Sequence, residues 1–178
     1  MLNSTISGNT AATDSGGVYI DSGATADIQF STIVSNTGGS GLNFSGVVTM
    51  TSSVIANHAQ DCGSTGLSDS GFNLDSDGSC SLTASTSQSN VDPQLLPLAN
   101  NGGNGETHMP MLTSPLLNVM AMGDNGCGTV VLVDQRGNAR PNQVHCDIGA
   151  VEGIGNYRPV AVGETYTVAE DLPTATGR

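Results

Sequence analysis

The sequence contains no tryptophan and no lysine, and only 3% of its residues are aromatic. A core without large aromatics has to be built from Val, Ile, Leu and Met, which suits architectures whose layers each bury only a few side chains. The lack of lysine and a formal net charge of −12 give a surface that repels nucleic acid and anionic membranes. We therefore expect no nucleic-acid partner, and we interpret the acidity as a solubility property.

Helical periodicity and long apolar runs are also nearly absent. The 24 glycines, with many Ser, Thr and Asn residues, favour tight turns over helix, and the one weak helical candidate is 115–122. No run is long enough to span a membrane, so we expect no membrane insertion. Residues 1–9 lack the features of a signal peptide, and we expect the chain to be a fragment that begins inside a repeat.

A short motif recurs three times in the first 57 residues. STIVSN at 31–36 has imperfect copies, STISGN at 4–9 and SSVIAN at 52–57. Each copy reads as a short strand followed by a turn that needs a left-handed backbone at the final Asn. This alignment puts three aliphatic residues at equivalent inward positions: Ile6, Ile33 and Val54.

The motif ends on Asn9, Asn36 and Asn57, which are 27 and 21 residues apart (36 minus 9 and 57 minus 36). One coil of this length holds about three short strands, and it cannot close a core unless further coils stack on it. Equivalent residues of stacked coils lie about 4.8 Å apart. We therefore predict an asparagine ladder in which each amide binds the next.

A second motif, Gly followed by alternating apolar residues, follows each of these asparagines, at 17–20, 41–44 and 71–74, and middle strands fit 26–30 and 47–51. The fixed order of the two motifs predicts an all-β fold, a solenoid of parallel strands that forms a β-helix. The alternative is a Ser/Thr/Gly-rich chain that repeats by composition alone.

The four cysteines form two pairs that are local in sequence, Cys62 with Cys80 and Cys127 with Cys146. Three pairings are formally open, and we favour the local one because each pair brackets a Gly-rich irregular stretch. A disulfide that closes a loop of roughly 20 residues stabilises by about 3 kcal/mol in the chain-entropy model. Disulfides indicate an extracellular or cell-surface location.

Metal sites are weakly indicated. There is no Cys-x-x-Cys, and His58, His108 and His145 lie at no zinc-ligand spacing. The stretch 75–78, DSDG, has the spacing that opens a calcium loop, but the later ligands are missing, so a plain β-turn is the preferred interpretation. We therefore expect no resident cofactor.

From residue 90 the repeat stops and Pro-punctuated motifs follow in a fixed order: DP at 92–93, LANNGG at 98–103, TH at 107–108, SP at 114–115, DQRG at 134–137, RP at 140–141 and CDIGA at 146–150. This ordered set resembles the C-terminal module of bacterial choice-of-anchor surface proteins, which are similar to pectin-lyase-like right-handed β-helices. The stretch 116–123 departs from the family pattern. The resemblance implies a right-handed parallel β-helix solenoid with an irregular disulfide-stapled C-terminal cap, in a secreted or surface-anchored bacterial protein.

The module contains two of the four cations, Arg136 and Arg140, close in sequence to Asp134, Asp147 and Glu152. We expect Arg–carboxylate pairs to fix this segment as a cap over the open end of the solenoid, where strand edges and apolar side chains need covering. The alternative is that these groups bind a ligand carboxylate.

Residues 157–178 resemble the opening strands of a cadherin-like or immunoglobulin-like tandem domain, which needs roughly 100 residues in full. Glu164, Glu170 and Asp171 have two interpretations, calcium ligands at a domain junction of the longer protein or a solvated acidic linker. The chain then divides into coils at 1–89, a cap module at 90–152, and a linker with the first strands of an incomplete domain at 153–178.

Catalysis within these residues is not expected. A uronate lyase needs a cation and a base on the coil surface, but the chain has no Lys and its first Arg is Arg136. A glycosidase needs converging carboxylates, and Asp14, Asp21 and Asp27 are scattered.

We expect a non-catalytic extracellular structural or adhesion-type module, with extracellular glycans or other surface proteins as partners. The alternatives are the C-terminal part of a carbohydrate-active β-helix with upstream catalytic coils, and glycan binding without catalysis.

Overall fold

The computed structural model describes residues 1–153. The fold is all-β, and its one helical element in this range is the 3-10 turn η1, Asp124–Gly126, so no helix forms over 115–122. The strands are short: β1 Thr5–Ser7, β2 Ser15–Ile20, β3 Thr25–Gln29, β4 Thr32–Val34, β5 Ser40–Phe44, β6 Val47–Thr51, β7 Val54–Ala56, β8 Gln60–Cys62, β9 Ser68–Asp69 and β10 Leu74–Asp75. The predicted strands at 157–178 lie outside the described residues.

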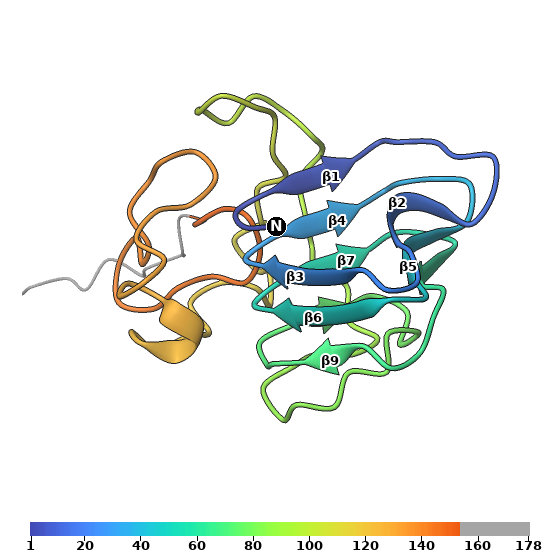
Figure 1. Ribbon diagram of the computed structural model, residues 1–178. Coiled ribbons are helices and arrows are strands. Elements are labelled where there is room, and N and C mark those ends of the chain that lie inside the picture. The colour runs from blue at the N-terminus through green and yellow to red at the C-terminus, as the bar shows by residue number, and fades with distance from the viewer. Residues whose placement is uncertain (154–178) are drawn as a thin grey trace, which may run out of the picture.

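The strands form three parallel sheets, with the orders β1-β4-β7-β10, β2-β5-β8 and β3-β6-β9. Each pass of the chain adds one strand to each sheet, so consecutive strands belong to different sheets and every third strand is a neighbour (Figure 1). This arrangement follows from the two interleaved sequence motifs, because residues one coil apart fall into register.

The register corrects the predicted alignment of the third motif by one residue. Ile6 pairs with Ile33, and Ile33 pairs with Ile55, whereas Val54 pairs with Thr32. The expectation that Val54 is equivalent to Ile6 and Ile33 was therefore wrong. Side chains alternate between the two faces of a strand, so a shift of one residue moves Val54 to the opposite face.

The interior core lies between the three sheets. Ile33 and Ile55 from one sheet meet Leu42 and Phe44 from the second and Val48 from the third. Met50, Ile28 and the disulfide-bonded Cys62 and Cys80 complete the buried cluster. These layers are thin and aliphatic, as the shortage of aromatic residues predicts.

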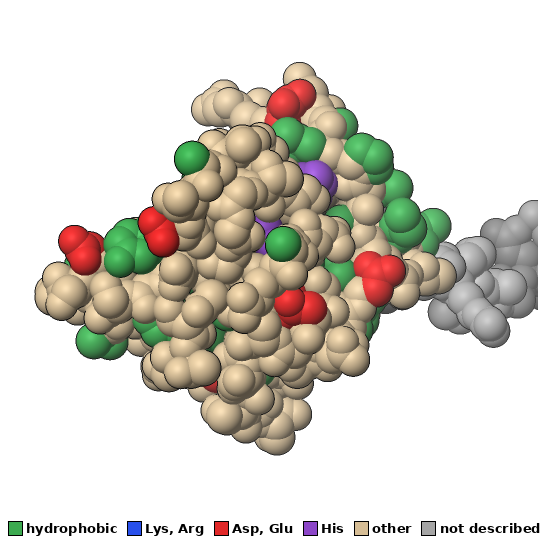
Figure 2. Space-filling model, turned by 90° about the vertical axis from the view of Figure 1, so that its right-hand side faces the viewer, with side chains coloured by type: hydrophobic (Ala, Val, Ile, Leu, Met, Phe, Trp, Pro, Cys, Tyr) green, Lys and Arg blue, Asp and Glu red, His purple; other side chains and the backbone are tan. Residues whose placement is uncertain are grey.

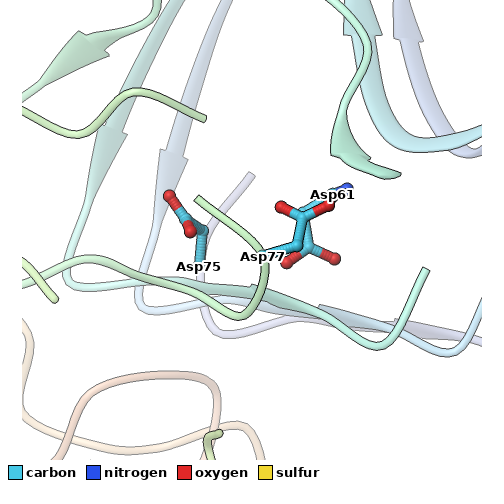
Figure 3. Close-up of side chains that lie close together, drawn as sticks. All are labelled: Asp61, Asp75 and Asp77. Atoms are coloured by element: carbon cyan, nitrogen blue, oxygen red, sulfur yellow. Dashed lines mark hydrogen bonds between the residues drawn. The ribbon is translucent and has the colours of Figure 1, made fainter. Parts of the chain in front are cut away.

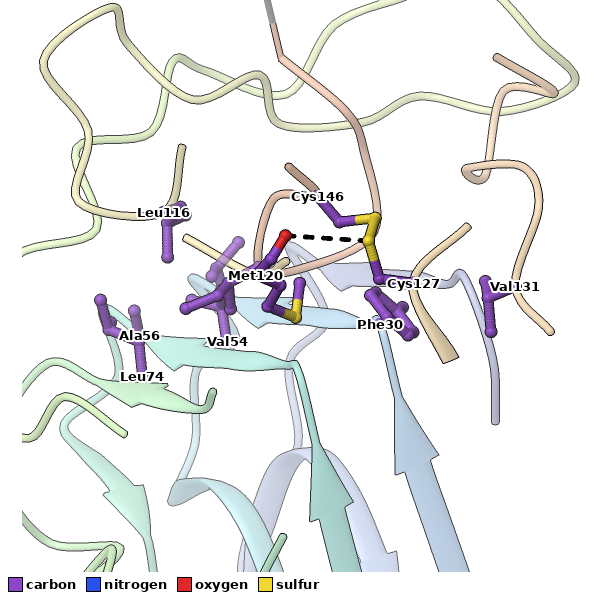
Figure 4. Close-up of a cluster of buried hydrophobic side chains, with 11 residues drawn as sticks. Phe30, Val54, Ala56, Leu74, Leu116, Met120, Cys127, Val131 and Cys146 are labelled. Atoms are coloured by element: carbon purple, nitrogen blue, oxygen red, sulfur yellow. Dashed lines mark hydrogen bonds between the residues drawn. A yellow bond between two sulfur atoms is a disulfide. The ribbon is translucent and has the colours of Figure 1, made fainter. Parts of the chain in front are cut away.

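A second core lies on the outer face of the sheet β1-β4-β7-β10. Val34, Val54, Ala56 and Leu74 point outward from this sheet and are buried under residues from a later segment: Leu116, Met120, Cys127, Val131, Cys146 and Ile148. Figure 4 shows these side chains around the Cys127–Cys146 disulfide. The sheet is thus buried on both faces.

This second core corrects the predicted position of the cap module. Residues 116–151 pack along the side of the stack, not across its end (Figure 1). The contact is also polar, because the Gly149 N–H donates to the Ser52 carbonyl at 2.9 Å and the Ala150 N–H to the Thr32 hydroxyl at 3.0 Å. The outward apolar side chains of β4 and β7 explain this position, since burying them removes apolar surface from water.

The end of the stack beyond β10 is covered by residues 76–90 instead. Gln88 pairs with Leu74, so this segment begins a further layer without forming a full strand. Cys80 and Leu82 pack against the interior core, and the Cys62–Cys80 disulfide ties the segment to β8. The two disulfides therefore serve different parts, one at the end of the stack and one in the segment on its side.

Candidate functional site

The asparagine ladder has one of its two predicted steps. The Asn9 side-chain Nδ2 donates to Asn36 Oδ1 at 2.9 Å, and the Asn9 backbone N–H donates to the same oxygen at 3.0 Å. The next partner of Asn36 is not Asn57 but the Nε2 atom of His58, at 3.2 Å. The one-residue register shift explains the change, because His58 and not Asn57 lies below Asn36.

Asn57 serves the turn itself. The residues with positive φ at this corner are Gly8 (φ 71°), Ser35 (φ 55°) and Asn57 (φ 61°), one position before Asn9, Asn36 and His58. Left-handed backbone is tolerated best by Gly and Asn. The prediction of a left-handed turn residue therefore fits Asn57 but not Asn9 or Asn36.

The ring of His58 continues into a carboxylate network. His58 Nδ1 lies 3.0 Å from Asp61 Oδ1, and both side chains are fully buried. Asp61 Oδ2 accepts the backbone N–H of Ser76 at 2.6 Å and its hydroxyl at 2.7 Å. This network links the corner of one coil to the loop that follows β10. Sequence reasoning missed Asp61, although its position three residues after His58 is compatible with such a pair.

Asp61 also belongs to the one group of carboxylates in residues 1–153 whose geometry suits a cation, Asp61, Asp75 and Asp77, with one oxygen of each within 4.8 Å of the others (Figure 3). A hard cation prefers such oxygen ligands. All six carboxylate oxygens already accept hydrogen bonds from the chain. A cation would have to displace these donors.

The bonds within this group fold the loop. Asp75 accepts the N–H of Gly78 at 2.6 Å, and Asp77 accepts the N–H of Ser79 at 2.9 Å and that of Asp61 at 3.0 Å. Burial alone would raise the pKa of Asp77, but the hydroxyl and N–H of Ser79 outweigh it and hold the pKa below its ordinary value. This is the hydrogen-bonding pattern of a turn, the preferred interpretation of 75–78.

A second carboxylate, Asp69, organises the same end of the stack. It accepts the N–H groups of Gly71, Thr83 and Ala84 at 2.8–3.0 Å, together with the side chains of Asn73 and Ser87. Burial opposes ionisation, but these donors outweigh it and lower the pKa of Asp69. No local motif marks this residue in the sequence, because most of its partners are 14 or more positions away.

The five charged residues predicted to hold the cap module meet in one cluster, in two separate pairs. Arg136 binds Asp134 through Nε and Nη2, at 3.0 and 2.7 Å from Oδ2. Arg140 binds Glu152, with Nη1 2.5 Å from Oε1, and both side chains are almost fully buried. The Arg140 guanidinium lies 4.3 Å from the centre of the Phe30 ring.

Asp147 pairs with neither guanidinium through its carboxylate. Its Oδ1 accepts the Asn118 N–H at 2.6 Å and its Oδ2 the Gly153 N–H at 2.5 Å, while its backbone carbonyl accepts from Arg140 Nη1 at 3.0 Å. Arg140 Nη2 also donates to the Gly149 carbonyl at 3.0 Å. The cluster therefore fixes the backbone of 147–153 by hydrogen bonds. Neither of its two guanidinium groups points toward solvent.

Burial governs the pKa values in this cluster. It raises the pKa of Glu152 to about 7, although Arg140 partly offsets it, and raises that of Asp147 to about 6 against the backbone N–H groups of Asn118 and Gly153. It lowers the pKa of Arg140. Burial would also raise the pKa of Asp134, but the Glu152 N–H and the Arg136 side chain outweigh it, and this pKa is lowered.

One face of the molecule carries little positive charge. The face to the right of Figure 1 is mostly backbone and uncharged polar side chains, with scattered hydrophobic and acidic side chains and no Lys or Arg (Figure 2). A polar groove of about 440 Å³ lies over the sheet β2-β5-β8, and its lining residues are Asp14, Gly39, Ser40, Asn43, Ala59, Gln60 and Gly63. Asp21 and Asp27 do not line this groove, so the three aspartates of the coils do not converge there.

Comparison with known proteins gives no relative: no protein-family model, no curated protein and no solved structure matches the chain. Within residues 1–153 there is no helix of the length and hydrophobicity that crossing a membrane requires.

Proposed function

We propose that the three parallel sheets form a right-handed parallel β-helix. Each sheet gains one strand per pass of the chain, in constant order, over three to four coils. Crossover connections between parallel strands of one sheet are right-handed in nearly all proteins, which supports the right hand. The resemblance to choice-of-anchor proteins agrees with this fold and with a pectin-lyase-like architecture.

We further propose that the chain is a structural or adhesion-type module of a larger secreted or surface-anchored protein. One observation carries this proposal: both cations of residues 1–153, Arg136 and Arg140, are engaged by carboxylates and carbonyls of their own segment. No cation is then left in this part to neutralise the carboxylate of an acidic sugar, as a uronate lyase requires. The two disulfides are compatible with an extracellular location.

Glycan binding is the second candidate. The polar groove over β2-β5-β8 offers the side chains of Asn43 and Gln60 for hydrogen bonds to sugar hydroxyls. Tyr19, which is 52% exposed, lies beside Asn43 in the strand register and presents an aromatic ring near this groove. Neutral glycans fit this face better than acidic ones, because Asp14 is the charged residue that lines it.

A polysaccharide panel tests the proposed function. The oxidised protein is incubated with neutral and uronate-rich polysaccharides, and binding and the release of unsaturated or reducing ends are measured. A structural module releases no product from any of them, and a glycan-binding module binds neutral chains with an affinity that Asn43→Ala reduces. Release of unsaturated uronates would refute both proposals and favour a carbohydrate-active β-helix.

A further inference from the structure

Ser7 and His108, 101 residues apart in sequence, are hydrogen-bonded to each other. Ser7 Oγ lies 2.8 Å from His108 Nε2, and His108 Nδ1 lies 2.8 Å from the carbonyl oxygen of Leu96. A carbonyl oxygen can only accept, so Nδ1 carries the imidazole proton, and the lone pair of Nε2 accepts the Ser7 hydroxyl proton. A hydroxyl, a base and an acceptor that orients the base form the arrangement of an activated serine.

An apolar groove is lined by Leu96 and by the residues that follow His108. Its volume is about 430 Å³, and its lining residues are Leu96, Met109, Pro110, Met111, Leu112 and Thr113. Leu96 is the residue whose carbonyl orients His108, Met109 follows His108 in the chain, and the Leu96 N–H donates to the Met109 carbonyl at 2.8 Å. The segments that line the groove therefore also hold His108 and the carbonyl that orients it, whereas Ser7 comes from β1. The volume of the groove is in the range of small-molecule sites.

We infer that Ser7 and His108 form a serine-type acyl-transfer site that hydrolyses carboxylic esters with an apolar acyl group, and that the groove holds this acyl group. The inference goes beyond the structural role proposed above. It depends on a contact between β1 and the 96–113 segment, and not on the arginine cluster or the polar groove.

The reaction needs only the ester and water. Ser7 Oγ attacks the ester carbonyl carbon, and its proton passes to His108 Nε2. His108 returns this proton to the leaving alcohol oxygen as the C–O bond breaks, which leaves an acyl-Ser7. Water then attacks the acyl carbon and gives a proton to Nε2, and that proton returns to Ser7 Oγ as the carboxylic acid departs.

Labelling and kinetics test the inference on the intact oxidised chain. A fluorophosphonate probe should form an adduct on Ser7, located by peptide mass spectrometry, and p-nitrophenyl butyrate should be hydrolysed. Ser7→Ala should abolish both signals. His108→Gln should slow hydrolysis about 10²- to 10⁴-fold, the usual contribution of a general base. Ser4→Ala is the matched control, because its hydroxyl donates only to the Leu2 carbonyl, and it should leave both signals unchanged.

A structural role for the pair predicts a different result. If Ser7→Ala lowers the melting temperature while hydrolysis persists, or if the folded wild-type protein neither reacts with the probe nor hydrolyses the ester, the inference is wrong. The groove has its own control in Leu112→Ser, whose side chain is 60% exposed. This variant should lower the rate on the butyryl ester more than on the acetyl ester, and an equal effect on both would remove the groove from the proposal.

Discussion

The backbone N–H of Ala150 donates to the hydroxyl of Thr32 at 3.0 Å, across 118 residues of sequence. Thr32 belongs to β4, and its side chain points away from the interior core toward the 116–151 segment. Gly149 contacts the same hydroxyl closely, because a Cβ placed on it would lie 2.8 Å from Thr32 Oγ1. The outer face of the sheet β1-β4-β7-β10 and the 116–151 segment are therefore complementary in shape and in hydrogen bonding at this contact.

This match predicts the effect of Thr32→Val. The variant keeps the shape of the side chain but leaves the buried Ala150 N–H without its acceptor, which costs about 1–3 kcal/mol. Denaturant unfolding should show this loss. Thr10→Val is the control, since Thr10 pairs with Thr37 at an exposed position, and it should change stability by less than about 0.5 kcal/mol. Equal effects of the two substitutions would contradict the buried contact.

The arginine cluster predicts unequal effects for its two arginines. Arg140→Ala leaves the buried Glu152 carboxylate without its partner, which typically costs about 3–5 kcal/mol. Arg136→Ala removes a pair that is nearer the surface and should cost less. The melting temperature is the measurement, with binding to an acidic sugar followed in parallel. Unchanged stability with lost sugar binding would instead identify a ligand site.

The same cluster predicts a pH dependence. The pKa of Glu152, ordinarily 4.5, is raised to about 7, and that of Asp147, ordinarily 3.8, to about 6. Groups with raised pKa values bind more protons in the folded state, so their contribution is fully present below the ordinary values and is lost as pH rises through 6 to 7. The free energy of unfolding should fall between pH 5 and 8 by about 1–3 kcal/mol.

Glu152→Gln should flatten this decline in the free energy of unfolding. The three aspartates with lowered pKa values should act in the opposite direction. The lowered pKa values of Asp69, Asp77 and Asp134 mean that their contribution is present above the ordinary value of 3.8 and is lost as pH falls further. Unfolding free energies across the pH range check both limbs. A free energy of unfolding that keeps rising from pH 5 to 8 would show that burial does not raise the pKa of Glu152.

The corrected register predicts opposite tolerances for two asparagines. Asn57 has a φ of 61°, so Asn57→Gly should be close to neutral, whereas Asn57→Val should be destabilising. Asn36 is 1% exposed and its amide contacts Asn9, Ile6 and His58, so Asn36→Ala should cost several kcal/mol. Thermal melts of the three variants check this order. A neutral Asn36→Ala would contradict the ladder.

Peptide mapping under non-reducing conditions checks the disulfides. Secreted protein should give the Cys62–Cys80 and Cys127–Cys146 peptides. Reduction should loosen two different regions, the end of the stack at 76–90 and the segment on its side, which hydrogen exchange can distinguish. A Cys80–Cys127 peptide, or free thiols throughout, would contradict the two-region arrangement.

The sequence alone predicts the strands β1 to β7 and the two local cysteine pairs, whereas β8 and β9 match neither motif. Short motifs such as STIVSN recur at intervals that allow successive copies to pair as parallel strands, and the local cysteine pairs leave loops of a length that a disulfide closes readily. The sequence also predicts that Arg136 and Arg140 pair with carboxylates, since few carboxylates lie near them in sequence, but it does not say which carboxylate binds which arginine. These features depend on residues that lie within one repeat of each other in sequence.

The tertiary structure decided the register of the third coil and the place of the 90–152 segment. SSVIAN aligns with STIVSN in two ways that differ by one residue, and only the packing of Ile55 inside and Val54 outside selects between them. The runs TIV in β4 and VIA in β7 have two or three adjacent apolar residues, which is typical of strands buried on both faces, yet they do not say what covers them. The covering segment follows β7 by some 60 residues, and contacts at that distance depend on shape complementarity between surfaces, which a local pattern does not encode.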